Sequence, residues 1–326
     1  MRLLLRGLVL SLALTAALAS ARTAFAQSWP ERLVRFITSQ AAGNATDIVA
    51  RITADQLSSR IGQPVVVENR PGGGNVIGTQ AAARAAPDGY TFFLATAAAL
   101  VTDPYTFKSL PYDPMKDFVP VAKVAEVSFM IMANPKVPAK NLKELIALAK
   151  AKPGKLTIAT DGTRRFSGMV VAWINKLAGI ETLQVPYTAQ RQGVQDAVAG
   201  TVDLIILAVP VARGLAANGQ LRPIATTSLK RLADQPDVPA IAETFPDFDF
   251  TGWQLLAAPT GTPEAVLTRV NRETDAIFKN PEIVKKLRDM GFSTSGAGTL
   301  KDAQDYVNLQ HKAWGRVVKE IGVQPE

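Results

Sequence analysis

Short apolar runs alternate along the chain with stretches in which apolar residues recur every three or four positions. Runs such as Leu33–Ile37 and Thr91–Ala95 are rich in β-branched and aromatic residues, which is typical of buried strands. The stretch Asp47–Ile61 instead has the spacing of a helix with one apolar face. The residues on that face are Ala50, Ala54, Leu57 and Ile61. The chain therefore alternates between strand and helix patterns from residue 33 onward.

This alternation predicts an α/β protein with parallel sheets that are covered by helices on both faces. The predicted strands are Leu33–Ile37, Val65–Val67, Thr91–Ala95, Phe129–Ala133, Leu156–Thr160, Leu183–Val185, Leu204–Leu207, Ile224–Thr227 and Gln254–Ala257. The predicted helices are Asp47–Ile61, Asn75–Ala86, Leu142–Ala151, Phe166–Leu177, Gly193–Ala199, Pro263–Phe278 and Lys301–Ile321. On the last of these, the expected buried stripe is Tyr306, Leu309, Ala313 and Val317.

The length exceeds the usual span of one domain, so two lobes are expected. Val127–Pro135 and Gly252–Pro259 are β-rich segments that end in proline, and both are predicted to cross between the lobes. Lobe 1 is then residues 27–127 plus 256–326, and lobe 2 is residues 128–255. A discontinuous lobe joined by two crossing strands is the architecture of hinge-closing binding proteins.

The N-terminus has the pattern of a secretory signal peptide. Arg2 and Arg6 precede an apolar stretch over residues 8–19, and Ala24–Ala26 supplies the small residues of a cleavage site. The alternative is a membrane anchor, but the apolar stretch is shorter than the roughly 20 residues that a spanning helix needs. Export to the periplasm with cleavage near Ala26 is expected, which makes residues 1–26 a signal peptide.

Composition narrows the class of partner. The chain has no cysteine, so it has neither disulfides nor thiolate chemistry. Without Arg2, Arg6 and Arg22 the formal charge of +8 becomes +5, and the remaining basic residues are scattered. A nucleic-acid partner is not expected, because such binding needs a concentrated basic surface. A mildly positive body is compatible with a small anionic ligand.

Signs of catalysis are weak. His311 is the single histidine and is interpreted as a solvated residue on the last helix. The chain has no G-x-S-x-G elbow and no H-E-x-x-H motif, so neither a catalytic residue nor a metal site is predicted. The glycines of Pro71–Asn75 lack the Lys-Ser/Thr of a phosphate loop, so no cofactor is expected either. That segment is interpreted as a turn in which Asn75 caps the following helix.

The best candidate for ligand binding is the loop that follows the first strand. Its side chains are small, and it leads directly into a helix whose first amides have no partner within the helix. A carboxylate is favoured there by those amides and by the helix dipole. The alternative is an ordinary turn that Thr46 or Asp47 caps. The candidate residues of this first loop are Ser39, Gln40, Ala42, Gly43, Asn44, Ala45, Thr46 and Asp47.

A second loop has the same placement after the Leu156–Thr160 strand. Arg164 and Arg165 could bind a carboxylate in bidentate fashion. Asp161 could instead pair with them, which would make the cluster a self-contained salt bridge. The candidate residues of this second loop are Asp161, Thr163, Arg164, Arg165 and Phe166.

Several motifs resemble the Bug family, the substrate-binding proteins of tripartite tricarboxylate transporters. They cover the chain in order: Val65–Gly72, Ala86–Thr91, Leu110–Pro114, Lys116–Phe118, Lys152–Leu156, Val185–Tyr187, Asp237–Pro239, Ala258–Pro263 and Trp314–Lys319. The resemblance implies a type II periplasmic-binding-protein fold, with a ligand cleft between two α/β lobes joined by a two-strand hinge. It also implies a carboxylate pocket built largely from main-chain amides and water on the first loop.

The chain departs from the family pattern at the pocket. The first loop lacks the usual prolines and has fewer glycines, and the second loop carries charged residues and Phe166. Thr188 stands where relatives often carry lysine or another polar residue. The remaining candidate ligand contacts are Thr96, Ala97, Tyr187, Leu207 and Ala208. These departures predict a larger or partly apolar carboxylate, aromatic or aliphatic.

We therefore expect a monomeric periplasmic solute-binding protein that captures a mono- or dicarboxylate by hinge closure. Its protein partners would be the membrane subunits of a tripartite tricarboxylate transporter. An alternative is a ligand-sensing protein that presents its closed form to a two-component sensor. A periplasmic enzyme is disfavoured by the lone His311.

Overall fold

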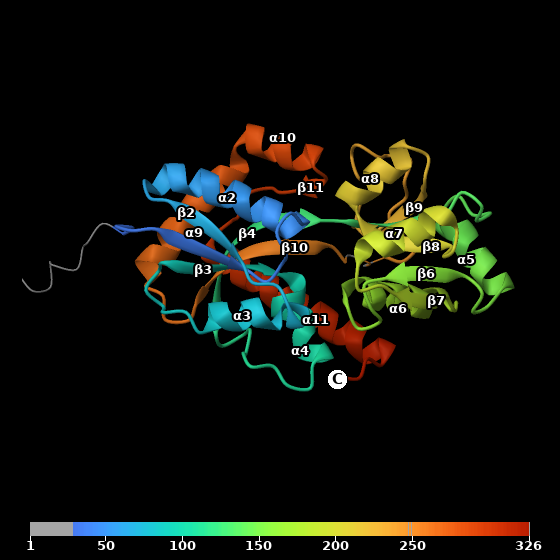
Figure 1. The fold of residues 1–326 in the computed structure, drawn as a ribbon, viewed down its shortest axis with the longest axis horizontal. Helices are drawn as coiled ribbons and strands as arrows, with labels where there is room; N and C mark the ends of the chain where they lie inside the picture. Colours follow the sequence, from blue (N-terminus) through green and yellow to red (C-terminus); the bar gives the residue numbers. More distant parts are fainter. Residues whose placement is uncertain (1–28, 247, 249, 326) are drawn as a thin grey trace, which may run out of the picture.

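The computed structural model describes residues 29–325 except residues 247 and 249. The predicted signal peptide lies outside the described residues. Two β-sheets lie side by side along the long axis of the molecule, each with helices packed on it (Figure 1). Within the described residues, no helix combines the length and apolar character that crossing a membrane requires.

The first sheet has the strand order β11-β4-β10-β3-β1-β2. β1 lies between β2 and β3 and is parallel to both, whereas β10 is antiparallel to β3 and β4, and β11 is antiparallel to β4. The strands are β1 Val34–Thr38, β2 Val65–Asn69, β3 Thr91–Thr96, β4 Phe118–Val127, β10 Gly252–Pro259 and β11 Phe292–Ser293.

Helices cover both faces of this sheet. α2, α9 and α10 contribute to the apolar cluster on one face, and α3 and α11 contribute to the cluster on the other. A π-helical turn and α4 follow β3. The bounds are α2 Ala45–Ile61, α3 Val76–Ala83, the π-turn Ala98–Thr102, α4 Asp103–Thr106, α9 Glu264–Lys279, α10 Pro281–Asp289 and α11 Leu300–Ile321.

The second sheet has the strand order β7-β6-β8-β5-β9. α5 and α6 pack on one face of it, and α7 and α8 pack on the other. Its strands are β5 Phe129–Ala133, β6 Thr157–Thr160, β7 Leu183–Pro186, β8 Leu204–Ala208 and β9 Arg222–Thr226. Its helices are α5 Leu142–Ala151, α6 Phe166–Ala178, α7 Gln190–Ala199 and α8 Val209–Ala217. Short 3₁₀ turns complete the elements at Gly73–Asn75 and Ile241–Glu243.

The α/β class is confirmed, but the expectation of purely parallel sheets is wrong. The chain leaves the first sheet at Val127 and enters the second at Phe129, and it is back in the first sheet at Gly252. β4 leads out and β10 leads back, so the two pair in opposite directions, with Gly252 opposite Val127. β5 is likewise antiparallel to β8 and β9. Both sheets are therefore mixed.

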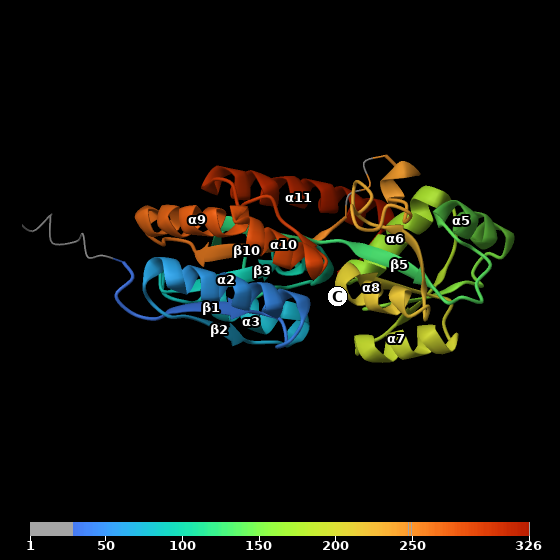
Figure 2. The same ribbon diagram turned by 90° about the horizontal axis from the view of Figure 1, so that it is seen from above.

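The helix patterns were read correctly on α2 and partly wrongly on α11. All four expected apolar residues of α2 are buried. On α11, Leu309 is 62% exposed. Val317 is buried as expected, and Val307 and Trp314 are buried beside it. The buried stripe differs because α11 packs on β4 and also contacts α6 of the second sheet. Figure 2 shows α11 extending toward α6.

Candidate ligand-binding cavity

A cavity of about 890 Å³ lies between the two sheets, a volume in the range of sites for small organic molecules. Both βα loops singled out from the sequence line it. The loop between β1 and α2 lies on the side of the first sheet, and the loop between β6 and α6 lies on the side of the second. The carboxyl ends of β1 and β6, which belong to different sheets, therefore meet at one cavity.

The first loop presents the start of α2 to this cavity. Asn44 caps the helix, since its Oδ1 accepts a 2.9 Å hydrogen bond from the Asp47 amide. The cap is therefore neither of the two residues expected, Thr46 and Asp47. The first-loop residues that line the cavity are Gln40, Ala42, Gly43, Asn44, Ala45 and Thr46.

Asp47 stabilises the first loop through hydrogen bonds on the side that faces away from the cavity. Its side chain is almost inaccessible and accepts hydrogen bonds from the Gly43 amide at 2.8 Å, from Arg51 at 3.0 Å and from Asn69 at 2.8 Å. Burial by itself raises the pKa of Asp47, but these donors outweigh it and hold the pKa below its ordinary value. Asp47 is placed as an internal anchor of the loop, away from the cavity lining.

Asn75 supports the same loop from the neighbouring turn. Its backbone is left-handed, with φ of 84°, and its side chain makes no cap of α3. The Asn75 Oδ1 accepts hydrogen bonds from Ser39 Oγ at 3.3 Å and from Gln40 Nε2. The expected capping role is therefore wrong, because the carboxamide is turned toward the first loop. Ser39 is buried behind the lining residues.

Two helical glycines permit each loop to approach its supporting helix. A Cβ on Gly78 of α3 would lie 2.6 Å from the Ser39 Cα. A Cβ on Gly168 of α6 would lie 2.1 Å from the Gly162 carbonyl oxygen. Both distances are shorter than any real Cβ contact. The positions of the two loops thus depend on the absence of a side chain at these sites.

In the second loop, Asp161 binds the start of α6. The Asp161 amide donates to Ser167 Oγ at 2.9 Å, and Asp161 Oδ1 accepts from the Ser167 amide at 3.2 Å and from Ser167 Oγ. Asp161 faces the cavity, yet surrounding protein removes much of its hydration, and this desolvation raises its pKa. The bonds to Ser167 and the charge of Arg165 oppose that rise.

Arg165 extends from the second loop toward the first sheet. Its guanidinium lies beside the glycine turn before α3, with Nη2 3.6 Å from where a Cβ on Gly74 would be. Its charge also acts on the buried Asp103 of α4. Burial raises the pKa of Asp103 to about 7, although hydrogen bonds with Asn75 and Tyr112 and the charge of Arg165 act against this rise. Arg165 thus carries positive charge into the space between the sheets.

Most of the remaining candidates also line the cavity. Thr96, Ala97, Asp161, Arg165, Phe166, Tyr187 and Ala208 do so. Thr163, Arg164 and Leu207 are placed outside the lining. Leu207 is only 1% exposed and belongs to the apolar cluster beneath α7 and α8, because side chains alternate along β8.

Sequence reasoning missed the part of the cavity that the crossing strands and the end of α10 supply. Val127, Phe129 and Gln254 line it from the crossing strands, and Met290 and Phe292 line it from the segment that ends in β11. The signal that could have located the first three was present, since both crossing strands were predicted. Phe129 also packs against Phe166 in a tilted arrangement, with ring centroids 4.6 Å apart, which gives the cavity an aromatic wall.

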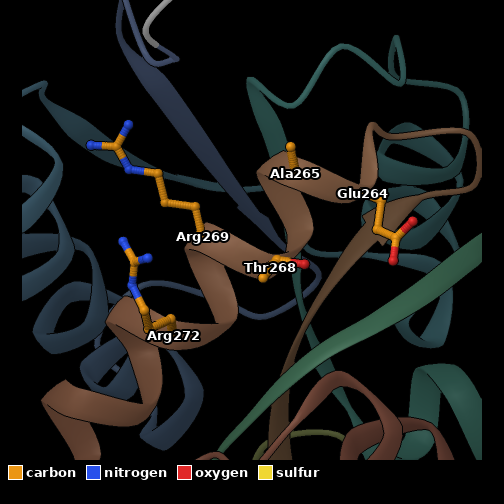
Figure 3. A pocket seen from close by; sticks show the side chains of 5 residues that line it. All are labelled: Glu264, Ala265, Thr268, Arg269 and Arg272. Atoms are coloured by element: carbon orange, nitrogen blue, oxygen red, sulfur yellow. The ribbon is translucent and has the colours of Figure 1, made fainter.

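A second hollow, of about 550 Å³, lies on the surface of α9 (Figure 3). Its lining comes from this one helix, and Arg269 and Arg272 project to one side of it. Arg269 lies over the Trp29 ring, 5.7 Å from its centroid, and Arg272 pairs with Glu273 at 2.8 Å. These cations are engaged by the protein itself. The cavity between the sheets is therefore the candidate site.

His311 is half-buried beside Tyr105, with ring centroids 6.2 Å apart, so its interpretation as a solvated residue is wrong. Desolvation lowers its pKa below the ordinary value, against a backbone hydrogen bond to Leu100 and the charge of Asp113. His311 projects from α11 toward the π-turn and is not among the residues that line the cavity. Among residues 29–325 as described, no three His, Asp or Glu side chains cluster as metal ligands.

The chain is similar to known proteins over nearly its whole length. The family described as "Tripartite tricarboxylate transporter family receptor" matches residues 49–323. A UPF0065 protein of Bordetella bronchiseptica is 34% identical over 325 residues, covering 98% of this chain and 96% of that protein. Protein BugT of Bordetella pertussis is 31% identical over 299 residues, covering 91% of each.

Solved structures agree with the fold. Rpa4515 of R. palustris with adipate has a TM-score of 0.83 at 30% identity, over 91% of this chain and 100% of that one. The periplasmic binding protein BugD has a TM-score of 0.79 at 30% identity, over 91% and 100%. MatC from Rhodopseudomonas palustris with bound malate has a TM-score of 0.76 at 28% identity, over 89% and 100%. The chain belongs to the tripartite tricarboxylate transporter receptor family and has the fold of its periplasmic solute-binding proteins.

Proposed function

We propose that this chain is a periplasmic solute-binding protein without catalytic activity, which captures a mono- or dicarboxylate in the cavity between its two sheets. The observation that carries the proposal is the convergence of two helix N-termini on one cavity. Ala45 and Thr46 of α2 line it from one sheet, and Phe166 and Ser167 of α6 line it from the other. Unpaired amides and the helix dipole favour an anion at such positions.

Arg165 adds a full positive charge to these amides. It lines the cavity and belongs to the second loop, while the first loop supplies small side chains and exposed main chain. A carboxylate between the loops would receive main-chain donors from one side and a guanidinium from the other. Aliphatic or aromatic carbon would lie against Phe129 and Phe166, whose rings contact each other at a tilt. Rpa4515 with adipate and MatC with malate are relatives whose ligands have this chemistry.

The two sheets would be the cores of two lobes that close on the ligand about the β4–β5 and β10 crossings. The bounds proposed from the sequence are residues 27–127 plus 256–326 for lobe 1 and residues 128–255 for lobe 2. Residues 252–255 pair with β3 and β4, so this part of lobe 2 is the crossing strand itself. Small-angle X-ray scattering tests closure and the monomeric state together. The radius of gyration should fall when a bound carboxylate is added, and the mass should remain that of one chain.

A thermal-shift screen of mono- and dicarboxylates, followed by calorimetry, tests the ligand class. At 100-fold excess over its Kd a true ligand adds about 2.7 kcal/mol of stability. Arg165→Met should weaken the binding of the best carboxylate about tenfold or more, since a charge-assisted hydrogen bond is lost. Arg191→Met on exposed α7 is the matched control and should leave the affinity unchanged. Stabilisation by sugars or cations alone would contradict the proposal.

The proposed function also includes delivery of the bound carboxylate to a membrane transporter of the tripartite tricarboxylate type. Host cells that lack this chain should lose uptake of the labelled carboxylate and regain it with the wild-type gene. Intact uptake together with a lost transcriptional response to the same carboxylate would instead indicate a sensory role. Recovery of the carboxylate chemically unchanged after incubation tests the absence of catalysis.

A further inference from the structure

Gln254 lines the cavity from the crossing strand β10. It is opposite Thr96 of β3 and opposite Ala125 of β4, and both Gln254 and Thr96 line the cavity. Its neighbours along the strand are the apolar Trp253, Leu255 and Leu256. Gln254 is only 3% exposed, so a primary amide is buried in a strand that otherwise packs as core.

The side-chain oxygen of this buried amide has no hydrogen-bond partner among the residues that the structure describes. The Gln254 Oε1 atom is buried and accepts no hydrogen bond. By contrast, Gln40 in the cavity lining binds Asn75 and Asn44, and Gln184 of β7 donates to the Gly168 carbonyl at 3.0 Å. A buried polar group without a partner costs free energy, so such groups in native proteins are usually completed by water or a ligand.

The backbone is irregular at this residue. The pairing of β10 with β4 shifts register between Gln254 and Leu255, from Ala125 to Lys123. A β-bulge bends its strand and redirects a side chain, and bulges are common beside binding sites. The register shift and the side-chain oxygen without a partner thus both occur at Gln254, beside the cavity.

We propose that Gln254 contacts the ligand and selects carboxylates that carry a hydrogen-bond donor, a hydroxyl or an amino group, on their carbon chain. This inference rests on the function proposed above. An ionised carboxylate has only acceptor atoms, so it cannot satisfy Gln254 Oε1. A hydroxyl or amino group on the ligand can donate to it while the carboxylate is held by the loops and Arg165. A site with an unfilled polar group discriminates strongly against ligands that lack the matching group.

Matched pairs of ligands test this selection by calorimetry: malate against succinate, and 3-hydroxyadipate against adipate. The wild-type protein should bind the hydroxylated member of the better pair about tenfold more tightly. In Gln254→Leu the two members should bind equally, with the affinity for the unsubstituted acid kept within about twofold. The Gln184→Leu variant alters a glutamine that is bonded within the protein and should retain the wild-type ratio.

A second measurement separates a ligand contact from a structural role. Because Gln254 Oε1 has no partner among the described residues, Gln254→Leu should leave the midpoint of thermal unfolding of the ligand-free protein unchanged or raise it, whereas Gln184→Leu should lower it. A lowered midpoint for Gln254→Leu would mean that the amide is bonded within the fold and would overturn the inference. Equal binding of both members by the wild type, or an unchanged ratio in Gln254→Leu, would overturn it as well, with the carboxylate function intact. Failure of all four acids to bind, together with a negative result in the wider carboxylate screen, would overturn both proposals.

Discussion

The Tyr187 hydroxyl donates a 2.7 Å hydrogen bond to Asp196 Oδ2 across the start of α7. Tyr187 lines the cavity, so its phenol group is held by the protein while its ring contributes to the wall. The ring also lies against Gly193, where a Cβ would be 3.2 Å from it, so both Asp196 and the absence of a side chain at Gly193 set its position. Tyr187 thus presents a positioned apolar surface to the candidate cavity.

Tyr187→Phe should therefore keep the affinity for carboxylates within about twofold, because the ring remains, while losing about 1 kcal/mol of stability with the hydrogen bond. Tyr187→Ala should lower the affinity about tenfold, since a contact surface is removed. Calorimetry of both variants checks this. An equal loss of affinity in both would show that the hydroxyl itself binds the ligand.

The bond to Asp196 also raises the pKa of Tyr187 to about 12, so ultraviolet titration should show that this tyrosine ionises at a higher pH than an ordinary tyrosine.

Asp47→Ala should destabilise the protein by about 2 kcal/mol and weaken carboxylate binding, although Asp47 is not in the cavity lining. The substitution leaves the Gly43 amide and the side chains of Arg51 and Asn69 without their shared acceptor. Urea denaturation measures the first effect, and calorimetry measures the second. Asp55→Ala alters an exposed carboxylate of the same helix and should change neither quantity appreciably.

Gly78→Ala should lower carboxylate affinity by displacing the first loop. The added Cβ would meet Ser39 Cα and the Arg70 carbonyl oxygen, both at 2.6 Å, and both are backbone atoms that cannot rotate away. The loss of carboxylate affinity, measured by calorimetry, should be larger than the loss caused by a substitution on the surface of a helix. The free energy of unfolding, measured by urea denaturation, should also fall.

The matched control for this variant is Gly214→Ala in α8. A Cβ there meets nothing within 4 Å, so alanine should stabilise the helix by about 0.5–1 kcal/mol without affecting binding. If Gly78→Ala behaves as Gly214→Ala does, the first loop does not depend on its close contact with α3.

Asp103 should make stability depend on pH between about 4 and 7. Burial raises its pKa to about 7, so the folded state holds a proton that the unfolded state has already released above pH 4. The stabilisation is complete below the unfolded pKa and is lost as the pH rises through the folded one. Urea denaturation at pH 5 and pH 8 should show a fall of about 2–3 kcal/mol from this group.

Asp103→Asn is the comparison that isolates this contribution, because every other titrating group is shared with the wild type. Asn retains a partner for the Tyr112 hydroxyl, which lies 3.4 Å from Asp103 Oδ2. The difference in unfolding free energy between the two proteins should change between pH 5 and pH 8. A constant difference would place the Asp103 pKa outside that window.

Much of the framework could be predicted because it follows from local patterns. Leu142–Ala151 forms a helix over the predicted residues, and Phe129–Ala133 forms a strand over the predicted residues. β4 was missed because Pro120 and the charged residues Lys123 and Glu126 interrupt its apolar pattern. Its long antiparallel pairing with β10 satisfies the backbone despite them.

The parts of the candidate site that lie on loops between a strand and the next helix could be predicted from the sequence. The parts that depend on the packing of distant segments could not. The first and second loops follow strands and begin helices, and these local features located Gly43 and Arg165 from the sequence. Asn75, Gln254 and Asp103 became relevant only because folding brings distant segments together. Whether Leu207 or Ala208 faces the cavity depended on strand register, which the apolar run LIILA does not define.

Helix α11 packs on β4 and on α6, and it carries the fully buried Trp314. Figure 2 shows α11 extending toward α6. The Trp314 ring lies 5.4 Å from that of Phe166, the first residue of α6, which lines the cavity. Indole emission depends on the atoms that surround the ring, so a change at the cavity wall reaches a fluorophore without any label. The protein therefore carries an intrinsic spectroscopic probe beside the candidate cavity, and stopped-flow measurement of its emission would follow the proposed ligand capture in real time.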